Sequence, residues 1–102
     1  MATRPLVVSV EELKQYLRIE HDEEDALIEE MLDSAQTAAE DLCRTEFGDN
    51  PDAVPAAIKA AIRMRAGYEY EKRSAPDEKS YNAMRRAFWD LVNPYQDPEK
   101  MF

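Results

Sequence analysis

The stretch DEEDALIEEMLDSAQTAAEDLCRT, residues 22–45, decides the fold of this chain. Its apolar side chains recur at spacings of three and four residues, which predicts one long amphipathic helix over about 23–45. These positions are Leu27, Ile28, Met31, Leu32, Ala35, Ala39 and Leu42. Asp22 is the expected N-cap, and the acids that follow it favour the positive end of the helix dipole. We expect this helix to stop before Gly48.

Three further helices are expected around this segment, which makes the chain a small all-α, four-helix domain covering residues 1–102. Ser9 and Glu12 form a capping box that starts a short helix over about 10–18. A third helix is expected over about 54–73 and a fourth over about 78–92, which Pro94 should stop. Residues 1–8 are expected to form an extended arm before a helical core over about 9–93. Residues 94–102 are expected to form a flexible tail.

The apolar content is low for a chain of this length. Leu, Ile, Val and Phe together supply 19 of the 102 residues, and the net charge is −9. This combination is typical of disordered chains, so either parts of the chain are loose in isolation or partner subunits bury the remaining surface. The helical periodicity favours partner subunits. The expected core is Leu17, Leu27, Ile28, Met31, Leu32, Ala35, Ile58, Ile62, Phe88 and Leu91.

The charge is divided unevenly along the chain. Residues 1–50 carry 14 acidic and 4 basic side chains, whereas residues 51–102 carry 8 acidic and 9 basic side chains. Phosphate neutralisation supplies most of the affinity of DNA-binding proteins, so this chain is not a plausible stand-alone DNA binder. The basic clusters Arg63 with Arg65 and Arg85 with Arg86 lie near Phe88 and Trp89. They are either solvated, or in contact with nucleic acid, or in contact with the acidic half of a neighbouring subunit.

The third option gives the candidate interface. The acidic face of the long helix would meet the arginines of the next copy. The subunit-interface candidates are Glu29, Glu30, Asp33, Arg63, Arg65, Arg85 and Arg86. Small residues in the third helix, including Ala60, Ala61 and Gly67, either permit close helix contacts or, for the alanines, only reflect high helix propensity.

We expect no catalytic, cofactor-binding or metal site. The single histidine, His21, lies in an acidic turn without the spacing of a metal site, and Cys43 is the only cysteine. No serine lies in a nucleophile elbow, and the glycines are too isolated to cradle a phosphate. There is no run of 18 apolar residues and no signal peptide, so we expect the chain to act in the cytoplasm or in a particle assembled there, without a membrane partner.

One pattern is familiar. The segment VSVEELKQYLRI, residues 8–19, leads into the acidic turn and ALI, residues 26–28. It resembles the opening of the small head–tail connector (head-completion or adaptor) proteins of tailed phages and prophages, often described as DNA-packaging proteins. PAAIKAAI, residues 55–62, and LVNPY, residues 91–95, resemble later segments of that family, although Gln96 stands where the family usually has an arginine.

The resemblance implies a structural role in the virion and no enzymatic activity. Members of the family form a ring of about a dozen subunits beneath the portal, which extends the DNA channel and receives the tail. The implied partners are further copies of the chain, the portal protein, tail-completion proteins and, passively, the packaged DNA. The implied location is the head–tail junction of a virion assembled in the bacterial cytoplasm. Two alternatives stay open: a small acidic helical regulatory protein that mimics nucleic acid, and a small terminase subunit.

Overall fold

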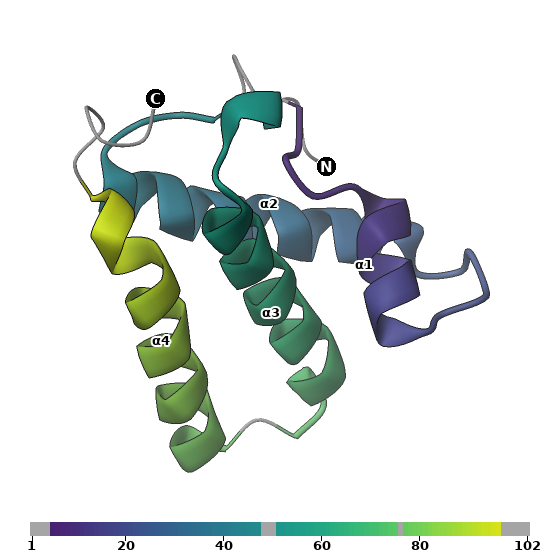
Figure 1. The fold of residues 1–102 in the computed structure, drawn as a ribbon. Coiled ribbons are helices and arrows are strands. Elements are labelled where there is room, and N and C mark those ends of the chain that lie inside the picture. Colours follow the sequence, from purple (N-terminus) through teal and green to yellow (C-terminus); the bar gives the residue numbers. More distant parts are fainter. Residues whose placement is uncertain (1–4, 48–50, 76, 97–102) are drawn as a thin grey trace.

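The computed structural model describes residues 5–47, 51–75 and 77–96, and these residues form an all-α fold, as the sequence predicts. The four helices are α1 (Val10–Leu17), α2 (Asp25–Cys43), α3 (Ala56–Lys72) and α4 (Glu78–Val92), shown in Figure 1. Two short 3₁₀ helices, η1 (Pro51–Ala53) and η2 (Asn93–Tyr95), precede α3 and follow α4. No strand occurs in the described ranges.

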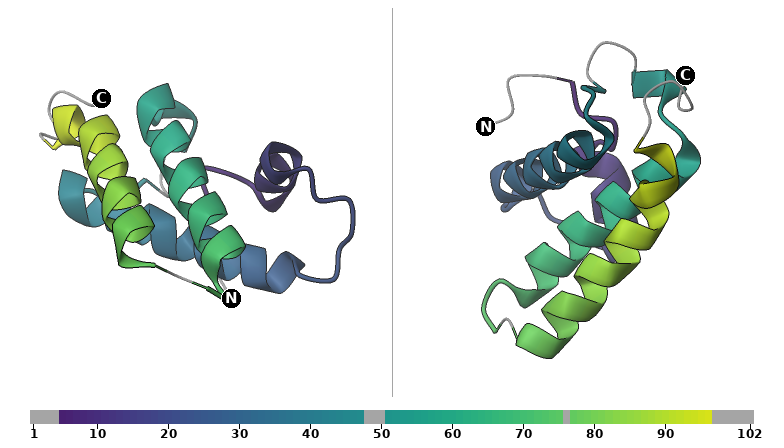
Figure 2. Two further views of the ribbon diagram at one scale, coloured as in Figure 1. Left: turned by 90° about the horizontal axis from the view of Figure 1, so that it is seen from below. Right: turned by 90° about the vertical axis from the view of Figure 1, so that its left-hand side faces the viewer.

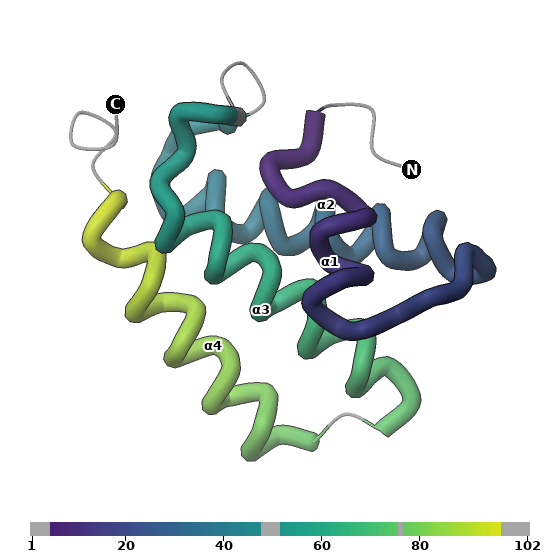
Figure 3. Tube along the Cα trace, turned by 45° about the vertical axis from the view of Figure 1, so that its right-hand side comes forward, coloured from purple at the N-terminus to yellow at the C-terminus, as the bar shows by residue number. Residues whose placement is uncertain are grey.

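Helix α3 lies at the centre of the arrangement and contacts the other three helices. It runs antiparallel to α4, and α2 crosses behind this pair (Figures 1 and 2). Helix α1 packs against α2 and α3 near the beginning of α2 (Figure 3). The fourth helix therefore lies at the opposite end of α2 from the first helix.

Local hydrogen bonds explain where two of the helices begin. The Ser9 hydroxyl accepts a bond from the backbone N–H of Glu12 at 3.1 Å, and the Glu12 carboxylate accepts one from the Ser9 N–H, which confirms the capping box. The Asp77 carboxylate accepts a bond from the Ser80 N–H at 2.8 Å. Helix α4 then runs over the predicted 78–92. Helices α1 and α2 both end at an arginine in the left-handed region, Arg18 with φ 60° and Arg44 with φ 56°.

The predicted N-cap of α2 is wrong. The helix begins at Asp25 after Glu24, whose side chain makes no capping hydrogen bond. The Asp22 carboxylate instead pairs with the ammonium of Lys14, which also binds Asp25 at 2.9 Å. Lys14 is buried, so its charge requires carboxylate partners, and this contact between α1 and the following turn takes Asp22 away from the helix end.

Most of the predicted core is confirmed. Six of the ten predicted side chains are fully or almost fully buried, namely Ile28, Leu32, Ala35, Ile58, Ile62 and Phe88. Leu17, Met31 and Leu91 are partly buried and pack against that cluster. Leu27 is only partly buried and lies outside the cluster, because it falls to one side of the buried stripe of α2.

The described part of the expected N-terminal arm is packed onto the core. Val7 and Val8 are 6% and 1% exposed, and residues 1–4 lie outside the described ranges. The buried side chain of Gln36 accepts a hydrogen bond from the Val7 N–H at 2.9 Å and donates one to Glu40 at 3.3 Å. Glu40 in turn accepts a bond from the Phe47 N–H at 2.8 Å. Two side chains one turn apart on α2 therefore hold segments on both sides of the helix in sequence.

Gly67 shows that a small residue of α3 serves close packing. A Cβ atom at this position would lie 3.2 Å from both Leu17 Cδ2 and Tyr16 Cε2 of α1. Such contacts are tighter than ordinary van der Waals packing. At this position, therefore, the glycine permits the close approach of α1.

Candidate functional site

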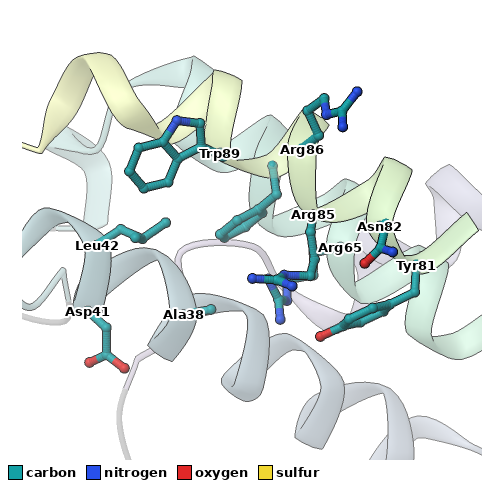
Figure 4. A pocket seen from close by; sticks show the side chains of 10 residues that line it. Ala38, Asp41, Leu42, Arg65, Tyr81, Asn82, Arg85, Arg86 and Trp89 are labelled. Carbon is teal, nitrogen blue, oxygen red and sulfur yellow. The ribbon is translucent and has the colours of Figure 1, made fainter. Parts of the chain in front are cut away.

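A groove of about 790 Å³ lies between α2 and α4. Tyr81, Arg85 and Trp89 follow one another at four-residue spacing along α4 and form one wall. Ala38, Asp41 and Leu42 of α2 form the other wall (Figure 4). Among the described residues, the large apolar side chains that are exposed are Tyr16, Tyr81 and Trp89, and two of these three line the groove. The groove therefore combines aromatic surface with three arginines and one carboxylate, Asp41, so its charge is positive on balance.

The floor of the groove is Arg65, which reaches it from α3. Its guanidinium carbon lies 4.8 Å from the centre of the Phe88 ring, and Phe88 is only 2% exposed. Its Nε lies 3.4 Å from Oε1 of Glu69, one turn along α3. The geometry is nevertheless too poor for a hydrogen bond, so this buried Nε has no hydrogen-bond partner. Arg65 is thus stacked on the Phe88 ring and paired with Glu69.

The structure separates the two arginines that the sequence groups together. Arg63 lies two residues before Arg65 and therefore points about 200° away around the helix. Its guanidinium carbon lies 5.1 Å from the ring centre of Tyr16 on α1. Arg85 and Arg86 are exposed, and both line the groove with Arg65. Three of the four candidate arginines are brought together, and Arg63 is not.

The acidic candidates lie on the N-terminal half of α2. Glu30 is exposed, whereas Glu29 and Asp33 are partly buried. Asp33 already has an interaction partner within the chain. Glu30 is consequently the most accessible of the three carboxylates for a neighbouring molecule.

A polar contact fixes the start of α2 against the end of α3. The Tyr70 hydroxyl donates a hydrogen bond to Glu24 at 2.6 Å, and Arg73 binds the other carboxylate oxygen at 2.9 Å. The Tyr70 hydrogen bond holds the pKa of Glu24 below its usual value, and the same bond raises the pKa of Tyr70. The acidic end of α2 is therefore held in one position relative to the central helix.

Other candidate chemistry can be placed as well. Cys43 is fully buried as the last residue of α2, and burial raises the pKa of its thiol to about 11, as expected for a structural cysteine. His21 is exposed in the turn before α2. No group of three or more His, Cys, Asp and Glu side chains in the described ranges is placed to hold a metal ion. Within the same ranges, no helix has the length and apolarity needed to cross a membrane.

The groove itself was not predicted from the sequence. Tyr81 is 39% exposed, although Met84 and Phe88, three and seven residues further along α4, are buried. The spacing of Tyr81, Arg85 and Trp89 was the available signal for a second, mixed aromatic and basic face. The opening depends on how far α2 and α4 diverge, which the spacing within one helix does not give.

Comparison with known proteins identifies the family. Residues 7–96 match the family described as phage gp6-like head–tail connector protein, and this match covers most of the chain. No curated protein and no solved structure shows significant similarity to the chain. Members of the matched family are structural components of the virion. This chain, an all-α protein with a mixed aromatic and basic groove on its surface, belongs to the phage gp6-like head–tail connector family.

Proposed function

We propose that this chain is a structural adaptor that forms a ring between the portal and the tail of a tailed phage or prophage. The observation that carries this proposal is the family match over residues 7–96. The groove adds support, because exposed aromatic side chains rimmed by charge are typical of protein–protein contact surfaces. The partners would be further copies of the chain, the portal protein and tail-completion proteins.

The subunits of this ring would meet through surfaces of opposite charge. The acidic face of α2, with Glu29, Glu30 and Asp33, would lie toward arginines of the next copy. Of those arginines, Arg65, Arg85 and Arg86 lie together at the groove and Arg63 lies apart, beside α1. Exposed ion pairs each contribute only about 0–1 kcal/mol, so the charges would set orientation while apolar burial supplies affinity.

The role we propose is not enzymatic and does not require gripping DNA. A subunit with a net charge of −9, repeated around a ring, repels phosphate at long range. DNA in the channel would therefore pass a surface that does not hold it. Assembly would take place in the bacterial cytoplasm, where the head is completed.

The test is association of the purified protein with itself and with its portal. The mass of the assemblies is measured by native mass spectrometry and light scattering from micromolar to millimolar protein concentration. Purified portal protein is then added and the measurement is repeated. The expected result is a ring, or a ring formed on the portal. If the protein stays monomeric, does not bind the portal protein and binds duplex DNA at physiological salt, the proposed connector function is wrong. The small-terminase alternative then takes its place.

A further inference from the structure

We propose that the groove between α2 and α4 binds the N-terminal half of α2 from a second copy of this chain. We call the surface that enters the groove the acidic knob and define it by Glu23, Leu27 and Glu30. Leu27 would lie between the groove walls, with Glu30 facing Arg85. This inference rests on the proposed ring, and it names the two surfaces that meet in it.

The groove leaves aromatic and basic side chains exposed to solvent. Tyr81 and Trp89 remain 39% and 44% exposed on one wall. Between the walls, the side chains of Arg65 and Arg85 point into the opening (Figure 4). The Nε of Arg65 is paired with Glu69 at 3.4 Å, whereas Arg85 and Arg86 are exposed at the groove. Such a groove is completed by an apolar side chain that brings carboxylates with it.

The acidic knob has the complementary chemistry. Leu27 is partly buried and lies outside the apolar core. Glu23 and Glu30 stand four residues before it and three after it, so both share its face of the helix, and both are exposed. Residues 19–43 contain no lysine or arginine. Arg73, which reaches the start of α2 from α3, is already bound to Glu24.

Another exposed apolar side chain fits the groove less well. Tyr16 on α1 is 51% exposed, more than any other large apolar side chain in the described ranges. The guanidinium carbon of Arg63 lies 5.1 Å from its ring centre. A surface that already carries this positive charge would be repelled by the three arginines of the groove, whereas the carboxylates beside Leu27 would be attracted.

The two surfaces lie far enough apart for one copy to use both. Leu27 and Leu42 are separated by about 22 Å along α2, at 1.5 Å per residue. Helix α1 and the start of α2 lie at one side of the molecule in Figure 1, and α4 lies at the other. Each copy can therefore offer its acidic knob to one neighbour while its groove receives the knob of another. Such head-to-tail contacts extend from copy to copy and can close into a ring.

The only tryptophan of the chain, Trp89, lies in the groove and reports directly on its occupancy. We expect its fluorescence emission to shift to shorter wavelength as the wild-type protein is concentrated from micromolar to millimolar. Glu30→Arg and Arg85→Glu should each weaken this association by about tenfold or more, as expected for charge reversal in a contact. Glu46→Arg and Lys79→Glu are matched controls, because both residues are exposed and belong neither to the groove lining nor to the acidic knob, so the shift should be unchanged.

Mixing experiments identify which surfaces meet. Glu30→Arg retains an intact groove, and Arg85→Glu retains an intact acidic knob. We expect each variant alone to stay monomeric where the wild type associates. Their mixture should associate again into oligomers in which the two variants alternate, because every contact between unlike variants then joins opposite charges. The double variant should associate again, because the reversed charges face each other across the contact. Circular dichroism of each variant is the control that its helices are retained.

Several results would overturn the inference. Trp89 emission that does not change up to millimolar concentration would show that no second copy enters the groove. Emission already shifted in dilute solution would show that another part of the same chain fills it. Loss of association in Arg85→Glu but not in Glu30→Arg would assign the groove to a different surface. A wild type that stops at a dimer would exclude the head-to-tail arrangement. In each case, binding to the purified portal still tests the proposed function separately.

Discussion

Replacing Gln36 with methionine should destabilise the fold and release the N-terminal segment. Gln36 is fully buried, and its side-chain oxygen accepts the hydrogen bond of the Val7 N–H at 2.9 Å. Methionine has a similar shape but cannot accept this bond with comparable strength. The substitution therefore leaves a backbone donor buried without a partner, while α2 keeps its packing volume.

The cost can be worked from these contacts. A buried donor without a partner costs about 1–3 kcal/mol. The other bonds of Gln36, to the Pro5 carbonyl and to Glu40, are both 3.3 Å long and add less, and Glu40 keeps its bond from the Phe47 N–H. We expect the free energy of unfolding to fall by about 2 kcal/mol, which corresponds to a decrease in melting temperature of about 10 °C for a domain of this size.

Urea denaturation followed by circular dichroism gives the free energy, and hydrogen exchange of the Val7 amide gives the local effect. Gln15→Met is the matched control, because Gln15 is exposed on α1 and its replacement should change stability by no more than about 0.5 kcal/mol. If Gln36→Met costs no more than the control and the Val7 amide stays protected, then Gln36 is not what satisfies the buried backbone.

Three other predictions concern pH, thiol chemistry and packing. The hydrogen bond from Tyr70 to Glu24 should stabilise the protein between the ordinary pKa values of 4.5 for Glu24 and 10.0 for Tyr70, and this contribution should disappear as the pH moves beyond either value. Tyr70→Phe should therefore lower stability at neutral pH and flatten both limbs of a stability–pH curve measured in urea; an unchanged curve would contradict this. Cys43 should resist alkylation at about pH 8 until urea unfolds the chain, as judged by mass spectrometry, and rapid labelling of the native protein would refute its burial. Gly67→Val should lower the free energy of unfolding by about 1–3 kcal/mol, measured by thermal denaturation, because the valine side chain must displace α1. Gly67→Ala is the comparison, and equal stability of the two variants would show that the contact between α1 and α3 is loose.

Helices with strong local signals were predictable. The bounds of α4 follow from Asp77, whose carboxylate caps the first turn, and from Pro94, which cannot continue the helix. The capping box at Ser9 likewise depends on residues within one turn. The start of α2 was not predictable in this way, because the side chain of Asp22 is taken by Lys14, which lies eight residues earlier. Local cap preference does not reveal that competition.

The candidate interface was only partly predictable for a related reason. The charge of a residue is visible in the sequence, but the face on which it lies depends on how the helix packs. Arg63 and Arg65 are close in sequence and reach opposite neighbours, α1 and α4. Leu27 fits the apolar periodicity of α2 yet lies outside the core. The spacing of apolar residues therefore does not show how many positions around α2 are buried. Packing between helices therefore sets the surface that the sequence alone leaves open.

The central position of α3 also has a consequence for how the chain reaches its folded state. Helix α3 packs against α2 and α4, its immediate neighbours along the chain, and most of the helical framework is thus built from pairs that are consecutive in sequence. Folds dominated by such local contacts have low contact order and typically fold within about microseconds to milliseconds. Encounters between subunits at micromolar concentration are slower than this. In the ring that we propose, the copies would therefore meet as completed units, and partner recognition would act on preformed surfaces.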